Sequence, residues 1–172
     1  MILFCGDPHG YFGHIIEAVQ EHQPAAVILF GDLQAQNLLG IELASILDET
    51  DRWFIHDTGL KTNHDHLLGS KLADRNLHGQ VVEIAGLRIA GFGGVQGDYE
   101  CLKNQRADIL VTHEAPSAHR HGFAAIDDLA RRLGVTTSFN AVDVGFRGII
   151  DQDGQPKTPN VIWKSLFGTS PE

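Results

Sequence analysis

Short runs of consecutive apolar residues alternate with helical apolar stripes over the first third of the chain. Runs at 1–5, 26–30 and 53–55 are typical of parallel strands that are covered on both faces. Apolar residues three and four positions apart predict one helix around 15–19 and another over 38–47. This order of strand, helix, strand, helix and strand predicts a parallel sheet.

The pattern changes beyond residue 80, where two strands flank a single glycine. Residues 81–85 and 87–91 are typical of a β-hairpin around Gly86. Further elements are expected as a strand over 108–112, a helix over 123–133, and strands near 137–139, over 142–150 and over 161–163. A βαβ half followed by a half rich in hairpins predicts one α/β domain, residues 1–172, with two sheets.

Composition and charge narrow the range of functions. The chain has 172 residues, enough for a substantial core, and its 42% hydrophobic and 20% charged residues are ordinary for a globular protein. The net charge of −9 argues against a nucleic-acid backbone as the main partner, because phosphate binding needs clustered Lys and Arg. A small phosphorylated substrate is still compatible with this charge, because bound divalent cations reverse the local sign.

Cysteine usage and hydropathy bear on the cellular compartment. Cys5 and Cys101 give neither a disulfide framework nor a Cys-x-x-Cys zinc site, and Cys5 is typical of a small core residue. The first apolar run has no basic region before it, which favours a strand over a signal peptide. Because no apolar run approaches membrane-spanning length, we expect a cytoplasmic protein without a membrane partner.

A candidate metal site begins directly after the first predicted strand, in the Gly-Asp-Pro-His-Gly sequence of residues 6–10. A carboxylate and an imidazole two residues apart lie on the same side of an extended backbone, so Asp7 and His9 can chelate one ion. Asp32 and His113 follow two other predicted strands, and the carboxyl ends of strands in open α/β sheets gather ligands at one edge. Mixed carboxylate and imidazole donors suit Mn, Fe, Zn or Ni better than Ca or Mg.

These blocks resemble the motifs of the calcineurin-like metallophosphoesterases. That family shows Gly-Asp-x-His, Gly-Asp-x-x-Asp, Gly-Asn-His-Asp, an isolated His after a strand, and Gly-His-x-His. Residues 6–9 match the first block. Asp32 lies in the second block, which here has Ala35 in place of its last aspartate. His113 matches the isolated histidine, and the likeness runs through almost the whole chain, including residues 72–79.

The resemblance implies a four-layer α/β/β/α sandwich with two mixed β-sheets and a binuclear metal centre. Asp7 and His9 would hold one divalent ion. Asp32 would bridge the two ions, and His113 would hold the second. The ions, with Mn favoured among Mn, Fe, Zn and Ni, would activate a hydroxide that hydrolyses a phosphate ester. The implied function is that of a metal-dependent phosphoesterase acting on a small phosphorylated substrate.

The third block of the family pattern is disrupted. The predicted strand ends in His56-Asp57 without the Gly-Asn that should come first, while Asn-His-Asp recurs at residues 63–65. One interpretation is a short deletion, which leaves His56 as the catalytic histidine. In the other, which we favour slightly, Asn63 is a metal ligand and His64 protonates or positions the leaving oxygen.

The last block, Gly-His-x-His, is absent. It should follow the strand near 137–139, but the chain has no histidine after His121. Each ion would then lack one ligand, unless His119 or His121 moves into the site. Because these two histidines share a loop with His113, solvated loop residues are the better interpretation of both.

Three explanations for these departures are open. The chain is a degenerate paralogue with weak or no metal binding, an engineered or truncated variant, or a sequence that lacks residues near 56–57 and 140–141.

Two other functions compete with hydrolysis. One is a catalytically impaired or non-catalytic binding module on the same fold. The other, a mononucleotide-binding protein without metal, is poorly supported because the first loop has neither a Gly-x-Gly-x-x-Gly run nor a P-loop lysine. The sequence determines neither the substrate nor the oligomeric state.

Overall fold

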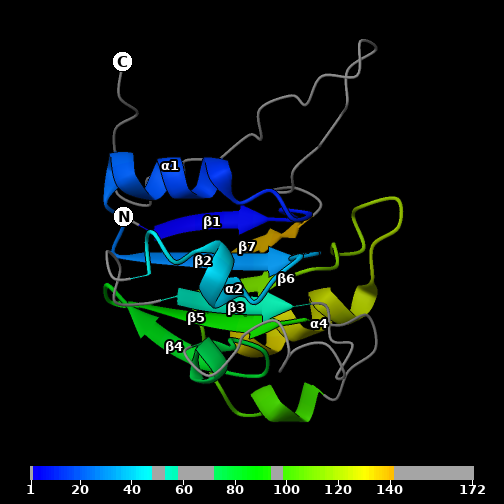
Figure 1. The fold of residues 1–172 in the computed structure, drawn as a ribbon. Coiled ribbons are helices and arrows are strands. Elements are labelled where there is room, and N and C mark those ends of the chain that lie inside the picture. Colours follow the sequence, from blue (N-terminus) through cyan, green and yellow to red (C-terminus); the bar gives the residue numbers. More distant parts are fainter. Residues whose placement is uncertain (1, 48–52, 58–71, 94–98, 142–172) are drawn as a thin grey trace, which may run out of the picture.

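Three parallel strands form the first sheet in this computed structural model (Figure 1). The structure describes residues 2–47, 53–57, 72–93 and 99–141. In sheet order the strands are β1 (Ile2–Gly6), β2 (Ala26–Gly31) and β3 (Trp53–Asp57). The register pairs Gly6 with Phe30 and Gly31 with Asp57, so the three strands end at the same edge of the sheet.

The second sheet has four strands and is mixed. The strands are β4 (Val81–Ile84), β5 (Leu87–Phe92), β6 (Ile109–Thr112) and β7 (Thr137–Asn140). β4 and β5 are antiparallel, whereas β5, β6 and β7 are parallel to one another. Ala85 and Gly86 join the hairpin with φ values of 51° and 79°, as a tight two-residue turn requires. The expected α/β fold with two sheets is confirmed, but the first sheet is parallel throughout its described strands, so only the second is mixed.

Two helices form where the apolar spacing predicts them, α1 (Gly13–His22) and α4 (Ala124–Leu133). α1 ends where Gln23 adopts a left-handed φ of 45° and donates its N–H to the carbonyl of Val19 at 2.9 Å. Pro24 follows and has no N–H with which to continue the helix. The sequence thus determines both the helix and its end.

The helix predicted over 38–47 is shorter than expected. α2 (Leu39–Glu42) has four residues, and turns follow it. Leu39, Leu43 and Ile46 are nevertheless buried in one core cluster. Apolar spacing records which residues are buried, and one helical turn followed by other turns can bury the same residues. In addition, Gly40 lowers the local helix propensity. Two 3₁₀ helices complete the described elements, η1 (Ala73–Arg75) and η2 (Tyr99–Leu102).

Three clusters of apolar side chains hold these elements together. The first joins one face of β1 and β2 to α1 and α2. The second lies between the other face of the same strands and the second sheet. The third joins the second sheet to α4. All six residues of β2 are buried as a result, which accounts for the unbroken apolar run in the sequence.

Some sequence predictions fall on other parts of the chain. The strands expected over 142–150 and 161–163 lie outside the described residues. Within the part that the structure describes, none of the helices combines the length and the apolar character needed to cross a membrane.

The second apolar cluster, between the two sheets, contains an aromatic pair that joins them. The rings of Phe4 and Phe139 stack with centroids 4.3 Å apart, and Phe139 is 5% exposed. We expect Phe139→Ala to lower the free energy of unfolding by about 3 to 5 kcal/mol, because it removes a buried ring and leaves a cavity. Urea denaturation measures this change. Ser138→Ala, on the exposed neighbouring residue, is the control, and an equally small effect of both substitutions would contradict the assignment.

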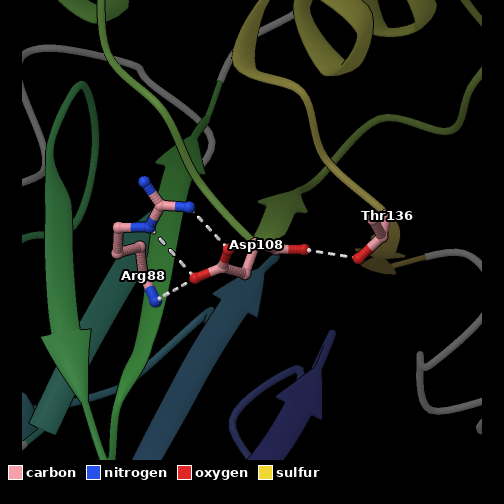
Figure 2. Close-up of polar contacts among 3 residues, drawn as sticks. All are labelled: Arg88, Asp108 and Thr136. Atoms are coloured by element: carbon pink, nitrogen blue, oxygen red, sulfur yellow. Dashed lines mark hydrogen bonds and ion pairs between the residues drawn. The ribbon is translucent and has the colours of Figure 1, made fainter.

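A charged clamp fastens the start of β6 to its neighbours (Figure 2). Arg88 donates its backbone N–H, Nε and Nη2 to the carboxylate of Asp108, at 2.9, 3.1 and 2.7 Å. The backbone carbonyl of Asp108 accepts the Thr136 hydroxyl at 3.4 Å. The side-chain hydrogen bond from Arg88 is the largest influence on the carboxyl group, and it lowers the pKa of Asp108 from 3.8 to about 2.

This clamp makes stability depend on pH. Because the pKa of Asp108 is lower in the folded state, its contribution is present above pH 3.8 and is lost as the pH falls toward about 2. We expect Asp108→Asn to be less stable than the wild type at about pH 5, with a difference that shrinks as the pH falls. Urea unfolding across this range, with the exposed Asp74→Asn as control, checks the result. A difference that is independent of pH would exclude the clamp as its source.

Candidate functional site

The loops that follow β1 and β2 are tied together along their backbones. The N–H of Asp7 donates to the carbonyl of Phe30 at 2.9 Å, and the N–H of His9 donates to the carbonyl of Asp32 at 3.0 Å. The next link, from Gly10 N–H to the carbonyl of residue 33, is 2.8 Å long. The first two sequence-predicted blocks therefore meet as one structural unit at the edge where the strands end.

The Asp7 carboxylate lies at the centre of this unit. Its Oδ1 accepts the backbone N–H of Asp32 at 2.8 Å. The same oxygen lies 3.7 Å from Nε2 of His113, which follows β6 in the other sheet. Both side chains are mostly shielded, with 17% of Asp7 and 21% of His113 exposed. The structure thus brings together one predicted ligand from each sheet.

Left-handed backbone conformations concentrate in the same loops. Asp7 and His9 have φ values of 45° and 46°, and Gln34 in the facing loop has 43°. Such conformations cost non-glycine residues about 1–3 kcal/mol each and gather at functional sites. They also correct the sequence-based geometry, because Asp7 and His9 do not lie on an extended strand. The turn around Pro8, and not strand alternation, places their side chains.

Gly31 allows the loops to approach this closely. It has a φ of 87°, and a Cβ at this position would overlap Asp7 Oδ1 and lie 2.8 Å from the Cβ of Ala141. Ala141 follows β7 and donates its N–H to the carbonyl of His113 at 3.2 Å. The ends of β2, β6 and β7 therefore lie against the Asp7 carboxylate.

The remaining predicted residues divide into two groups. His9 and Asp32 join the unit through their backbones, whereas their side chains form no hydrogen bond or ion pair with Asp7 or His113 among the described residues. Asn63 and His64 lie outside the described residues, and for His56 the structure describes only the backbone, which pairs with Phe30. 

The donor set fits a metal only in part. Carboxylate and imidazole are suitable donors for a transition metal, and Asp7 and His113 already lie close together. Within the described ranges, however, no three His, Cys, Asp or Glu side chains lie close enough to hold an ion. Cys5 does not add a donor, because complete burial raises the pKa of its thiol to about 12 and so keeps it protonated.

Two polar residues that the sequence reasoning did not single out, His78 and Arg75, lie in the segment before β4. Nδ1 of His78 accepts the backbone N–H of Gly93 at 3.0 Å, which leaves Nε2 to carry the proton in the neutral ring. Nη1 of Arg75 is buried and has no hydrogen-bond partner among the residues that the structure describes, an arrangement that calls for an acceptor. The available signal was their position in residues 72–79, a polar segment included in the family resemblance.

Comparison with known proteins identifies a relative by sequence and a protein with a similar fold. The chain matches no family model. It is 33% identical to an uncharacterized protein of Haemophilus influenzae over 216 residues, covering 90% of this chain and 95% of the relative. A protein of known crystal structure has a similar fold, with a TM-score of 0.57 and 14% identity over 81% of this chain and 82% of its own. This second likeness concerns the fold alone.

The alignment with this relative is longer than the chain itself. Its 216 residues exceed the 172 of this chain, so the relative contains internal segments that have no counterpart here.

The close approach at Gly31 can be tested by adding one methyl group. We expect Gly31→Ala to lower the free energy of unfolding by about 2 kcal/mol or more, because it combines a left-handed φ with steric overlap. Thermal or urea unfolding measures the loss. Gly13→Ala is the matched control, because its Cβ would meet nothing within 4 Å and alanine favours the helix. A neutral Gly31→Ala would show that Asp7 is not held against this position.

Proposed function

The chain belongs to the same family as the uncharacterized Haemophilus influenzae protein, and we propose that it is a metal-dependent phosphoesterase. The carrying observation is the convergence of Asp7, held by the N–H of Asp32, with His113 from the other sheet. Parallel strand ends are the usual location of ligand sites in α/β proteins. Left-handed φ values at two adjacent candidate ligands, Asp7 and His9, support a functional interpretation of the same loops.

The distribution of charge supports a site that needs cations. The first 51 residues contain four Asp, four Glu and no Lys or Arg, and they include two of the three loops at the site. An anionic phosphate ester would be repelled by these carboxylates. Divalent ions reverse that sign, so a phosphoryl substrate and a metal requirement are expected together.

The residues of this chain have separate roles in the proposed reaction. Asp7, His9, Asp32 and His113 would hold the ions, with Asn63 as a further ligand. When bound, the ions supply the acidity that converts water into a nucleophile for phosphorus. His64, or alternatively His56, would donate a proton to the leaving oxygen. The backbone N–H of Asp32 holds the Asp7 carboxylate in a fixed orientation, so this ligand is already placed before substrate arrives.

The proposal also covers the arrangement of the layers, the bound ions, the substrate and the cellular location. We propose the four-layer α/β/β/α sandwich of metallophosphoesterases, supported by the three separate core clusters between helices and sheets. Two ions, with manganese favoured, a small phosphorylated substrate and a cytoplasmic location complete it. The assignment of all 172 residues to one domain stays a prediction from the sequence.

A second candidate is a catalytically impaired or non-catalytic binding module on the same fold. It is favoured by the absence of any three-donor group from the described residues and by the internal segments that the relative has in addition. Elemental analysis separates the two candidates. Two tightly held ions per chain support the enzyme, whereas metal below one ion per chain without turnover supports the module. Parallel analysis of the Haemophilus influenzae protein would show whether the additional segments restore the metal.

Asp32→Asn tests the proposed activity directly. With manganese present, we expect the wild type to hydrolyse a generic phosphodiester and the variant to lose about 100-fold or more of that rate, because an amide is a poorer bridging ligand than a carboxylate. A chelator should abolish the wild-type rate. The variant keeps the backbone N–H that holds Asp7, so its unfolding curve should match the wild type.

The control for this experiment is Glu17→Gln, an exposed acidic residue on α1 that removes the same charge at a distance from the strand ends. It should retain the wild-type rate. Turnover that is no greater than in buffer for the wild type, or equal rates for wild type and Asp32→Asn, would reject the phosphoesterase proposal.

A further inference from the structure

A pocket of about 420 Å³ opens beside α4, against the face of the second sheet that is turned away from the first sheet. This volume lies in the range of small-molecule sites, about 300–1,000 Å³. The pocket is lined by the loop before β6 and by α4, whereas His113 follows the end of β6, so the pocket is separate from the candidate metal site. The lining residues are Leu102, Lys103, Asn104, Arg106, Leu129 and Arg132.

Positive side chains gather at this pocket although the chain is acidic overall. Of the seven Lys and Arg residues in the described part of the chain, three line the pocket, and no Asp or Glu lines it. Lys103 forms an ion pair with Glu100 at 2.6 Å. Lys103 therefore shares its charge with a carboxylate, while Arg106 and Arg132 add two further cations to the lining. The lining thus has the opposite sign to the protein as a whole.

Helix capping does not account for all of these cations. The last four backbone carbonyls of α4 all accept hydrogen bonds. Three of them, those of residues 130, 131 and 133, accept the backbone N–H groups of residues 135, 134 and 107 in that order. The fourth, that of Arg132, accepts Nη1 of Arg106 at 2.5 Å. Arg106 therefore has a structural role. The guanidinium of Arg132 takes no part in the cap, and it has no hydrogen bond or ion pair with the residues that the structure describes.

We propose that this pocket binds the phosphoryl group of a small molecule. Arg132 presents a planar set of N–H donors that matches phosphate oxygens, and Lys103 on the opposite loop adds a point charge. Leu102 and Leu129, which are 2% and 3% exposed, form an apolar floor beneath them. The shared chemistry is a multiply charged phosphoryl group, carried by a single phosphate or by a diphosphate. The proposal does not depend on the proposed hydrolysis.

Isothermal titration of the full chain tests this site with two probes, inorganic phosphate and pyrophosphate. A chelator in the buffer removes divalent ions, so the candidate metal site cannot bind the probe through them. We expect one site per chain, stronger binding of pyrophosphate if the ligand carries a diphosphate, and weaker binding as salt rises from about 50 to about 500 mM. Arg132→Gln should weaken binding roughly tenfold, because it removes charge-assisted hydrogen bonds.

The matched control is the neighbouring residue on the helix. Arg131 carries the same charge but pairs with Asp128 at 2.6 Å and does not line the pocket, so Arg131→Gln should leave the affinity unchanged. Asp32→Asn should also bind the probes as the wild type does, whatever its effect on hydrolysis. Absence of binding by the wild type, or equal losses in Arg131→Gln and Arg132→Gln, would overturn the proposal.

Discussion

The hydrogen bond from the backbone N–H of Asp32 to Oδ1 of Asp7 fixes how the ends of β1 and β2 meet. It forms because residue 31 has no side chain, since a Cβ there would occupy the position of the carboxylate oxygen. Once Asp7 is held, the imidazole of His113 reaches it from the other sheet at 3.7 Å. The geometry of the candidate site therefore depends on one acceptor, one amide and the absence of one methyl group.

This constraint is supported by the packing of the two sheets. The apolar cluster between them, with the Phe4–Phe139 stack, sets how far the end of β2 lies from the ends of β6 and β7. Ala141, which follows β7, packs beside Gly31 and donates its backbone N–H to the carbonyl of His113. A small residue is therefore packed at the end of β7, beside Gly31 and the Asp7 carboxylate. The strand ends approach one another closely, and within the described residues no three potential metal donors gather at that edge.

Negative and positive side chains gather in different parts of the molecule. The acidic first 51 residues build two of the loops at the candidate metal site, and the cations of the loop before β6 and of α4 gather behind the second sheet. A phosphoryl group would need added cations at the first place and would meet side-chain cations at the second. Two chemically different environments for one class of ligand are thus built into a small acidic protein.

Within the described residues, the sequence by itself determined the strands and the two longer helices, α1 and α4. Unbroken apolar runs predicted β1 and β2, and Gly86 between two short strands predicted the hairpin, because burial on both faces and a left-handed turn leave direct marks on composition. The gathering of Asp7, Asp32 and His113 at strand ends also followed from strand order alone. The length of α2 did not, because apolar spacing records burial and not continuous helical hydrogen bonding.

Only the tertiary structure decided how the site is assembled. It replaced the extended Asp7–His9 arrangement by a left-handed turn, because backbone hydrogen bonds to the β2 loop over-determine the conformation of both residues. It also brought together Lys103 and Arg132, which are distant in the sequence and unremarked by any motif, because the loop before β6 caps the carbonyl end of α4. Local pattern therefore specified which residues stand at the ends of elements, and packing between the layers decided which of them meet.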